Sequence, residues 1–121
     1  MQNKKEDFVK FLDERTSAVY KDVNRLTEDN RKDEANFEKI RANIYQVLKT
    51  IFLASMRTSG EEWEQIRYFG GRLDVMEETW RGSLAKASEH NDTVRVIQEQ
   101  VKLEVMDEVR KTFKEMWGME A

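Results

Sequence analysis

The stretch "RYFGGRLDVMEETW", residues 67–80, decides the fold because it keeps the spacing of an α-helix across two adjacent glycines. Apolar residues recur here every three or four positions, as they do on one face of a helix. Starting one residue earlier, they are Ile66, Phe69, Leu73, Met76 and Trp80. The stripe passes the glycines without losing phase, so it predicts one continuous helix. Three roles stay open for the pair: a notch in which Gly70 lies against a neighbouring ring while Gly71 faces water, a kink or hinge, and an incidental pair.

Three further segments carry apolar stripes with the same period. The stripes are Phe8, Phe11, Leu12, Val19, Val23 and Leu26 in the first; Phe37, Ile40, Ile44, Val47, Leu48 and Ile51 in the second; and Val94, Ile97, Val101, Val105, Val109 and Met116 in the last. Together with the glycine-containing segment, they predict helices over approximately 4–26, 31–57, 60–89 and 92–117.

Short polar segments separate these helices and contain residues that cap helix starts. Ser59 followed by Glu62 fits a capping box, in which each side chain satisfies a free backbone N–H at the start of the third helix. We expect Asn30 to cap the second helix, and Asn91 or Asp92 to cap the fourth.

Composition and length favour a single helical domain. The chain has 121 residues with no proline and no cysteine, so helices can run uninterrupted and disulfides are absent. Connections of a few residues force consecutive helices to run antiparallel. We therefore predict an all-α protein with one domain over residues 1–121, folded as an antiparallel up-down-up-down four-helix bundle. The alternative is a set of long hairpins that complete their core only in a dimer.

The charge pattern gives no reason to expect nucleic acid or a membrane as a partner. Acidic and basic residues are interspersed and leave a formal net charge of −3, so there is no broad positive field for phosphates or anionic lipids. The first residues, "MQNKKEDF", lack the apolar run of a signal peptide, and no window approaches the ~20 apolar residues of a membrane span. We expect a cytoplasmic protein.

Two of the predicted helices carry a second apolar row beside the main stripe. The rows are Tyr45, Phe52 and Met56 in the second helix, and Met106, Phe113 and Trp117 in the fourth. These helices are thus apolar over about half their circumference, which is more than one side of a bundle needs. The six residues are a candidate interface for a homodimer. The alternatives are that they complete the core of the single chain, or that they bind another protein.

Three charged residues fall on or beside the apolar stripes near mid-length: Arg15, Glu77 and Glu108. If they converge, a guanidinium between two carboxylates forms a candidate buried polar layer that fixes the register of the helices. The alternatives are long side chains that extend from the stripe edges to water, and a ligand site.

Catalytic and metal chemistry find little support in the sequence. The only histidine, His90, has Ala87 three positions before it, so the Glu-x-x-His motif of di-iron bundles is absent. Without cysteine, and with this histidine at a helix end, no convincing nucleophile with its base can be assembled. Glu104 and Glu108 could share a cation, although a solvated face explains their spacing more simply. We expect no catalytic residue, cofactor or metal.

The sequence therefore predicts a non-enzymatic helical bundle, most simply a protein-interaction or structural module that self-associates through the second apolar rows, or binds another protein there. The alternative is a small-molecule binder with an aromatic pocket in its core, lined by Phe11, Trp63, Phe69 and Trp80. Helical bundles serve many functions, so the fold alone does not choose between these two classes.

Overall fold

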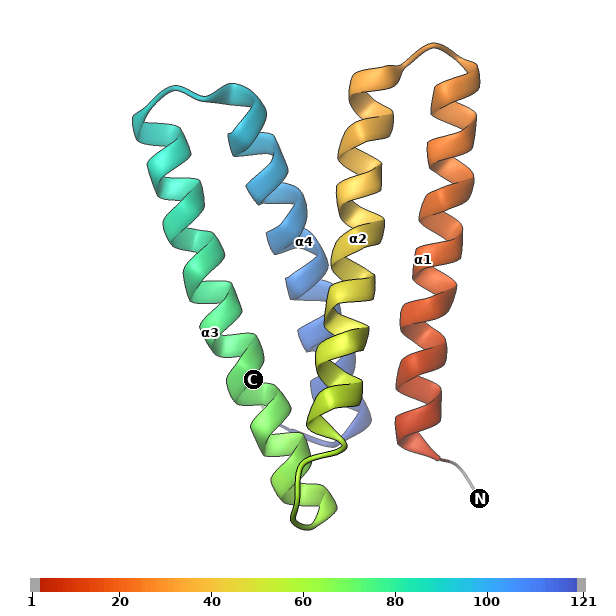
Figure 1. The fold of residues 1–121 in the computed structure, drawn as a ribbon, viewed down its shortest axis with the longest axis vertical. Helices are drawn as coiled ribbons and strands as arrows, with labels where there is room; N and C mark the ends of the chain where they lie inside the picture. The colour runs from red at the N-terminus through yellow and green to blue at the C-terminus, as the bar shows by residue number, and fades with distance from the viewer. Residues whose placement is uncertain (1–2, 120–121) are drawn as a thin grey trace.

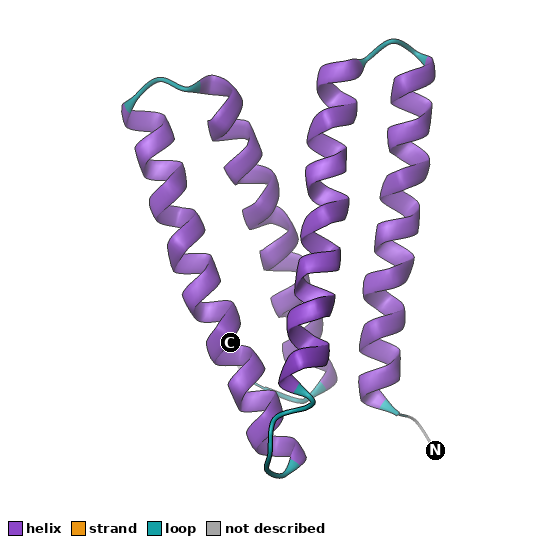
Figure 2. Cartoon of the chain, viewed as in Figure 1, coloured by secondary structure: helices purple, strands orange, loops and turns teal. Residues whose placement is uncertain are grey.

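Four long helices make up nearly all of residues 3–119, the part of the chain that the computed structural model describes (Figure 2). They are α1 (Lys4–Glu28), α2 (Lys32–Ser55), α3 (Glu62–Glu89) and α4 (Thr93–Met116). Consecutive helices run in opposite directions (Figure 1), and the predicted all-α four-helix bundle is confirmed. Residues 1–2 and 120–121, at the two ends of the single predicted domain, lie outside the described residues. Over residues 3–119, no helix has the length and apolar character that crossing a membrane requires.

The starts of α1 and α4 are fixed by side-chain caps. The Oδ1 atom of Asn3 accepts hydrogen bonds from the backbone N–H groups of Lys5 and Glu6, at 3.1 and 3.3 Å. Asp92 accepts one from the backbone N–H of Arg95 at 3.2 Å, which confirms one of the two caps expected for the fourth helix. Each cap satisfies N–H groups that have no partner inside the helix.

The other two predicted caps are wrong. Asn30 has φ of 60° and ends α1 in the left-handed region, so its side chain does not cap α2. Before α3, Gly60 has φ of 119°, a conformation that favours glycine, and the capping pair lies further on. There the backbone N–H of Glu61 donates to Glu64 at 3.2 Å. The helix therefore begins two residues later than the sequence pattern predicts.

The four helices form two hairpins that diverge. The α1–α2 hairpin and the α3–α4 hairpin stand apart at their turns and come together at the opposite end, where the loop from α2 leads into α3 (Figure 1). Both α2 and α4 contact all three of the other helices. This central position explains why these two helices carry the widest apolar faces.

An aromatic cluster fills the end where the hairpins meet. Each helix contributes one phenylalanine that is at most 2% exposed: Phe8, Phe52, Phe69 and Phe113. The ring centroids of Phe8 and Phe52 lie 4.7 Å apart, and those of Phe69 and Phe113 lie 5.0 Å apart with their planes close to perpendicular. Edge-to-face contacts of this kind contribute about 0.5–1.5 kcal/mol per pair beyond burial. The cluster therefore joins the two hairpins where they meet.

The adjacent glycines do not interrupt α3. The helix is continuous through Gly70 and Gly71, as predicted, and neither glycine has a positive φ, so they do not form a left-handed hinge. The interpretation of Gly70 as a packing notch is only partly correct. A Cβ atom added at Gly70 would lie 3.7 Å from the Phe113 ring, which is ordinary van der Waals contact rather than a clash. A Cβ atom at Gly71 would meet nothing within 4 Å.

Candidate binding groove

The residues of the candidate dimer interface lie mostly inside the single chain, so that prediction is wrong for them. Tyr45, Phe52, Met106 and Phe113 are buried in the core. The other two, Met56 and Trp117, are partly buried and pack against it. The physical reason is that α2 and α4 each contact three helices, and a second apolar row is needed to cover the additional contact. Completion of the core, the alternative left open by the sequence, accounts for both rows.

The candidate polar layer is neither buried nor complete. Nε of Arg15 lies 3.4 Å from Oε1 of Glu108, but their side chains are 51% and 37% exposed. Glu77 does not join them. It lies 3.5 Å from Arg81 and 3.9 Å from Arg110, between α3 and α4. The structure therefore divides the layer into two partly solvated groups, and long side chains at the edges of the stripes explain both of them.

The sequence pattern did not indicate that Tyr45 takes part in the first of these groups. Its hydroxyl donates a 2.6 Å hydrogen bond to Oε1 of Glu108, the same oxygen that faces Arg15. Burial of the ring, followed by the hydrogen bond to Glu108, raises the pKa of the Tyr45 phenol above its ordinary value. Tyr45 thus combines a core ring with a polar contact between α2 and α4.

A buried carboxylate, Glu99, was also missed from the sequence. It is 4% exposed, and Lys102 holds one of its oxygens at 3.1 Å. The ammonium of Lys102 also lies 5.7 Å from the centre of the Trp80 ring. The second oxygen, Oε2, has no hydrogen-bond partner within residues 3–119. A signal was present, because Glu99 precedes Met106 by seven residues and so continues the apolar row of α4 toward its start.

The aromatic residues proposed for a core pocket do not meet at one place. Phe69 is fully buried in the aromatic cluster, Trp80 lies beside Lys102, and Trp63 is 60% exposed. Of the four residues proposed, Trp63 lines the groove between α3 and α4. The four residues therefore do not together line the core pocket that the small-molecule alternative assumed.

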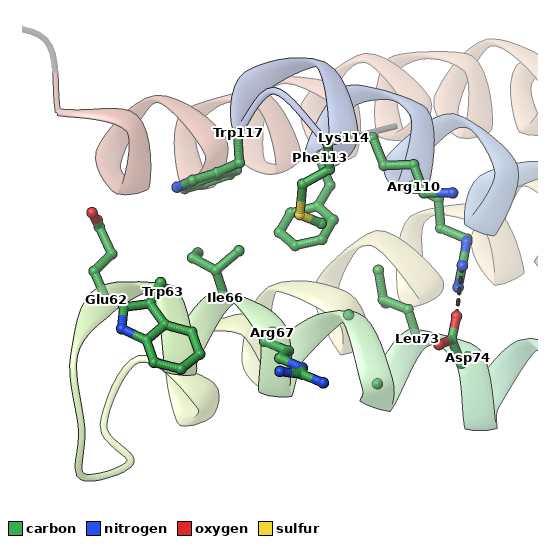
Figure 3. A pocket seen from close by; sticks show the side chains of 13 residues that line it. Glu62, Trp63, Ile66, Arg67, Leu73, Asp74, Arg110, Phe113, Lys114 and Trp117 are labelled. Carbon is green, nitrogen blue, oxygen red and sulfur yellow. Dashed lines mark hydrogen bonds and ion pairs between the residues drawn. The ribbon is translucent and has the colours of Figure 1, made fainter. Parts of the chain in front are cut away.

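The groove lies between the first half of α3 and the last half of α4, at the end of the molecule that holds the aromatic cluster (Figure 3). Its volume is about 720 Å³. The lining residues are Glu62, Trp63, Ile66, Arg67, Gly70, Gly71, Leu73, Asp74, Arg110, Phe113, Lys114, Trp117 and Met119.

Apolar side chains from both helices face each other at one end of the groove. Trp63 and Ile66 project from α3, and Trp117, directly after the last residue of α4, lies opposite them with Phe113 beside it (Figure 3). The two glycines of α3 form part of the wall and add no side chain to it. The groove thus has an aromatic end whose walls come from opposite helices.

Arg110, Lys114 and Asp74 lie at the other end of the groove, whereas Glu62 and Arg67 lie toward the aromatic end (Figure 3). Arg110 bridges the helices, with its Nη2 atom 2.6 Å from Oδ1 of Asp74, and Lys114 lies beside it (Figure 3). Neither Lys114 nor Arg67 forms an ion pair within the described part of the chain. The Nη1 atom of Arg110 and the indole Nε1 of Trp117 are buried without a hydrogen-bond partner there. The unpaired polar groups around the groove are therefore cations and N–H donors.

No family model, curated protein or solved structure matches this chain. Between residues 3 and 119 there is no group of three or more His, Cys, Asp or Glu side chains that could hold a metal ion. The groove has aromatic and apolar surface with Glu62 at one end, and Arg110, Lys114 and Asp74 at the other, an arrangement suited to binding.

Proposed function

We propose that the protein is a non-enzymatic binding protein that holds a small amphipathic organic anion in the groove between α3 and α4. The observation that carries this proposal is the polarity of the groove. Trp63 in α3 and Trp117, directly after α4, lie across the groove from each other at one end, and Arg110 and Lys114 lie at the other (Figure 3). A volume of about 720 Å³ also suits a small molecule, since typical ligand pockets measure roughly 300–1,000 Å³.

The unpaired groups favour an anionic head. The carboxylates that line the groove already have partners, since Asp74 holds Arg110 at 2.6 Å and Glu62 lies 3.9 Å from Lys5. Arg67 and Lys114 keep their charge free within the described residues. A carboxylate or sulfonate on the ligand would accept hydrogen bonds from Lys114, which lies beside Arg110, whereas a ligand cation would be repelled there (Figure 3).

The glycine pair supports the same proposal. A glycine inside a helix costs about 0.5–1 kcal/mol relative to alanine, and α3 carries two of them side by side. Neither glycine is required by the backbone, because neither has a positive φ. Their positions in the groove wall give them a role, since any side chain longer than a methyl at Gly70 would extend toward Phe113 and fill the space.

A matched series of naphthyl compounds tests the proposal: 2-naphthylacetate, 2-naphthylethanol and 2-naphthylethylammonium share a ring system and differ in the charge of the head. Binding is followed by NMR through the indole N–H resonances of the three tryptophans. Trp63 and Trp117 line the groove, and Trp80 serves as an internal control. We expect the indole N–H resonances of Trp63 and Trp117 to shift, and 2-naphthylacetate to bind about tenfold more tightly than 2-naphthylethylammonium.

Two pairs of variants locate the site. Gly70→Leu should abolish binding by filling the groove, whereas Gly82→Leu adds the same side chain to α3 outside it. Lys114→Gln should weaken the carboxylate about threefold, and Lys39→Gln, which changes an exposed lysine on α2, should not. A shift of Trp80 alone, or equal affinity for all three heads, would contradict the proposal. A second hollow, lined by α1 and by Phe52, Leu53 and Met56 at the end of α2, has no tryptophan in its lining, so binding there would leave the groove tryptophans unshifted.

A further inference from the structure

A tight turn follows α4 and brings Met119 back to the groove. Gly118, two residues after the helix, has φ of 64°, in the left-handed region that favours glycine. The backbone N–H of Met119 then donates to the carbonyl oxygen of Lys114 at 2.8 Å. A left-handed residue followed by this hydrogen bond is the Schellman turn that ends many helices. Because the chain turns back here, Met119 lines the groove together with Lys114.

Met119 also lines a smaller hollow of about 400 Å³. The groove and the smaller hollow share Arg110, Lys114 and Met119, so these three side chains form the boundary between them. The remaining residues around the smaller hollow are all acidic or basic. Among the described residues that line it, Met119 is therefore the one uncharged side chain.

The boundary is firm at Arg110 and soft at Met119. The guanidinium of Arg110 is held between the helices by Asp74 at 2.6 Å and by Glu77 at 3.9 Å. The side chain of Met119 is unbranched and flexible, and the residue is 38% exposed. Shortening Met119 would therefore open the boundary without removing a charge or a large part of the core.

The position of the boundary sets the length of an acid that fits the groove. Trp117 follows Arg110 by seven residues, which corresponds to about 10 Å along a helix axis. A naphthyl ring with one methylene before its carboxylate is about this long, so its head reaches Arg110 and Lys114 when its ring lies at the aromatic end. A longer chain would press the carboxylate against the boundary.

We propose that Met119 determines the length of the ligand. Its side chain closes the groove beside Arg110 and Lys114, and it thereby selects short acids over longer ones. This inference rests on the proposed function, because it concerns the anion that binds in the groove. It goes further in assigning the selection to one side chain, which the left-handed turn at Gly118 holds in place.

Two acids with the same ring test the inference: 2-naphthylacetate, and 6-(2-naphthyl)hexanoate, whose chain is four methylenes longer. Their affinities are measured through the indole N–H resonance of Trp63, which lines the groove from α3 rather than from the turn. The wild-type chain should bind the longer acid about tenfold more weakly, because that acid overfills the groove. Met119→Ala should bind the two acids within about threefold of each other. Met119→Leu keeps the volume of the side chain and should keep the wild-type preference.

A second pair of variants moves Met119 without changing it. A Cβ atom at Gly118 would meet nothing within 4 Å, so the backbone conformation decides the effect of a substitution there. Gly118→Val is strained at positive φ and should release the turn, and with it the preference for the shorter acid. Gly118→Asn tolerates this conformation and should keep the preference. Both positions are exposed, so circular dichroism should show unchanged helix in all four variants.

The outcomes separate this inference from the proposed function. If 2-naphthylacetate binds and Met119→Ala prefers it as strongly as the wild type does, the inference is overturned and the proposed function stands. Equal affinity of the wild-type chain for the two acids has the same meaning. A wild-type chain that binds neither acid overturns the proposed function, and this inference with it.

Discussion

The hydroxyl of Tyr45 in α2 donates a 2.6 Å hydrogen bond to Oε1 of Glu108 in α4. The tyrosine ring belongs to the core, whereas the carboxylate is partly solvated and also faces Arg15 at 3.4 Å. One atom of Glu108 thus connects three helices at the edge of the core. The arrangement requires a neutral phenol, because a phenolate would face a carboxylate.

Stability should decrease at alkaline pH through this phenol. Burial and the bond to Glu108 raise the pKa of Tyr45 above its ordinary value of 10.0. A group whose pKa is raised on folding stabilises the folded state fully below its unfolded pKa, and that stabilisation is lost as pH rises toward the folded pKa. Urea unfolding between pH 7 and 11 should therefore show the free energy of unfolding falling above about pH 10.

Comparison with Tyr45→Phe isolates this contribution from the lysines that titrate in the same range. The variant should be less stable at pH 7 by about 0.5–1.5 kcal/mol, the net contribution of one hydrogen bond, and its free energy of unfolding should fall less steeply above pH 10. Tyr20→Phe, which removes a phenol that is half exposed, is the matched control. Equal slopes for the wild type and Tyr45→Phe would contradict the role of Tyr45.

Phe52→Glu should unfold the chain rather than produce a folded monomer. Phe52 is fully buried, with its ring centroid 4.7 Å from that of Phe8 and 5.1 Å from that of Phe69. The substitution removes these contacts and buries an unpaired charge, at a cost of more than about 4 kcal/mol. Circular dichroism should show loss of helix. Full helicity with a lower mass would instead place Phe52 at a surface between chains.

The sequence predicts those features of the structure that depend on residues close together in the chain. Helical periodicity and the cap at Asp92 are local, so four helices could be predicted with ends correct to within about two residues. A wide apolar face looks the same whether it meets a second chain or an additional helix of its own chain. For that reason the sequence pattern places Phe52 and Phe113 at an interface between chains, whereas the structure buries them in the core of one chain. The groove could not be predicted from the sequence either, because Trp63 and Trp117 are far apart in the chain and come together only when α3 packs against α4.

Glu99 and Lys102 should respond to substitution in opposite directions. Glu99 is buried with one oxygen unpaired within the described residues, so Glu99→Leu removes a desolvation cost and should be neutral or stabilising by about 1 kcal/mol. Lys102→Met leaves the carboxylate without its 3.1 Å partner and should destabilise the chain by about 3 kcal/mol. Thermal melts of both variants measure the contrast. Similar small losses in both would mean that Glu99 is solvated.

Alanine substitutions at the glycines should separate backbone need from helix propensity. Gly60 has φ of 119°, and a Cβ atom there would approach Glu64 at 3.1 Å, so Gly60→Ala should destabilise the chain by about 1–3 kcal/mol.

Gly70 and Gly71 lie inside a continuous helix without positive φ, and the nearest contact of an added Cβ is 3.7 Å, from Gly70 to Phe113. Both Gly70→Ala and Gly71→Ala should therefore stabilise α3 by about 0.5–1 kcal/mol. Gly82→Ala, in open space on the same helix, sets the reference gain. If Gly70→Ala instead lowers the stability while Gly71→Ala and Gly82→Ala raise it, the Phe113 ring cannot move aside, and Gly70 is a closely packed notch.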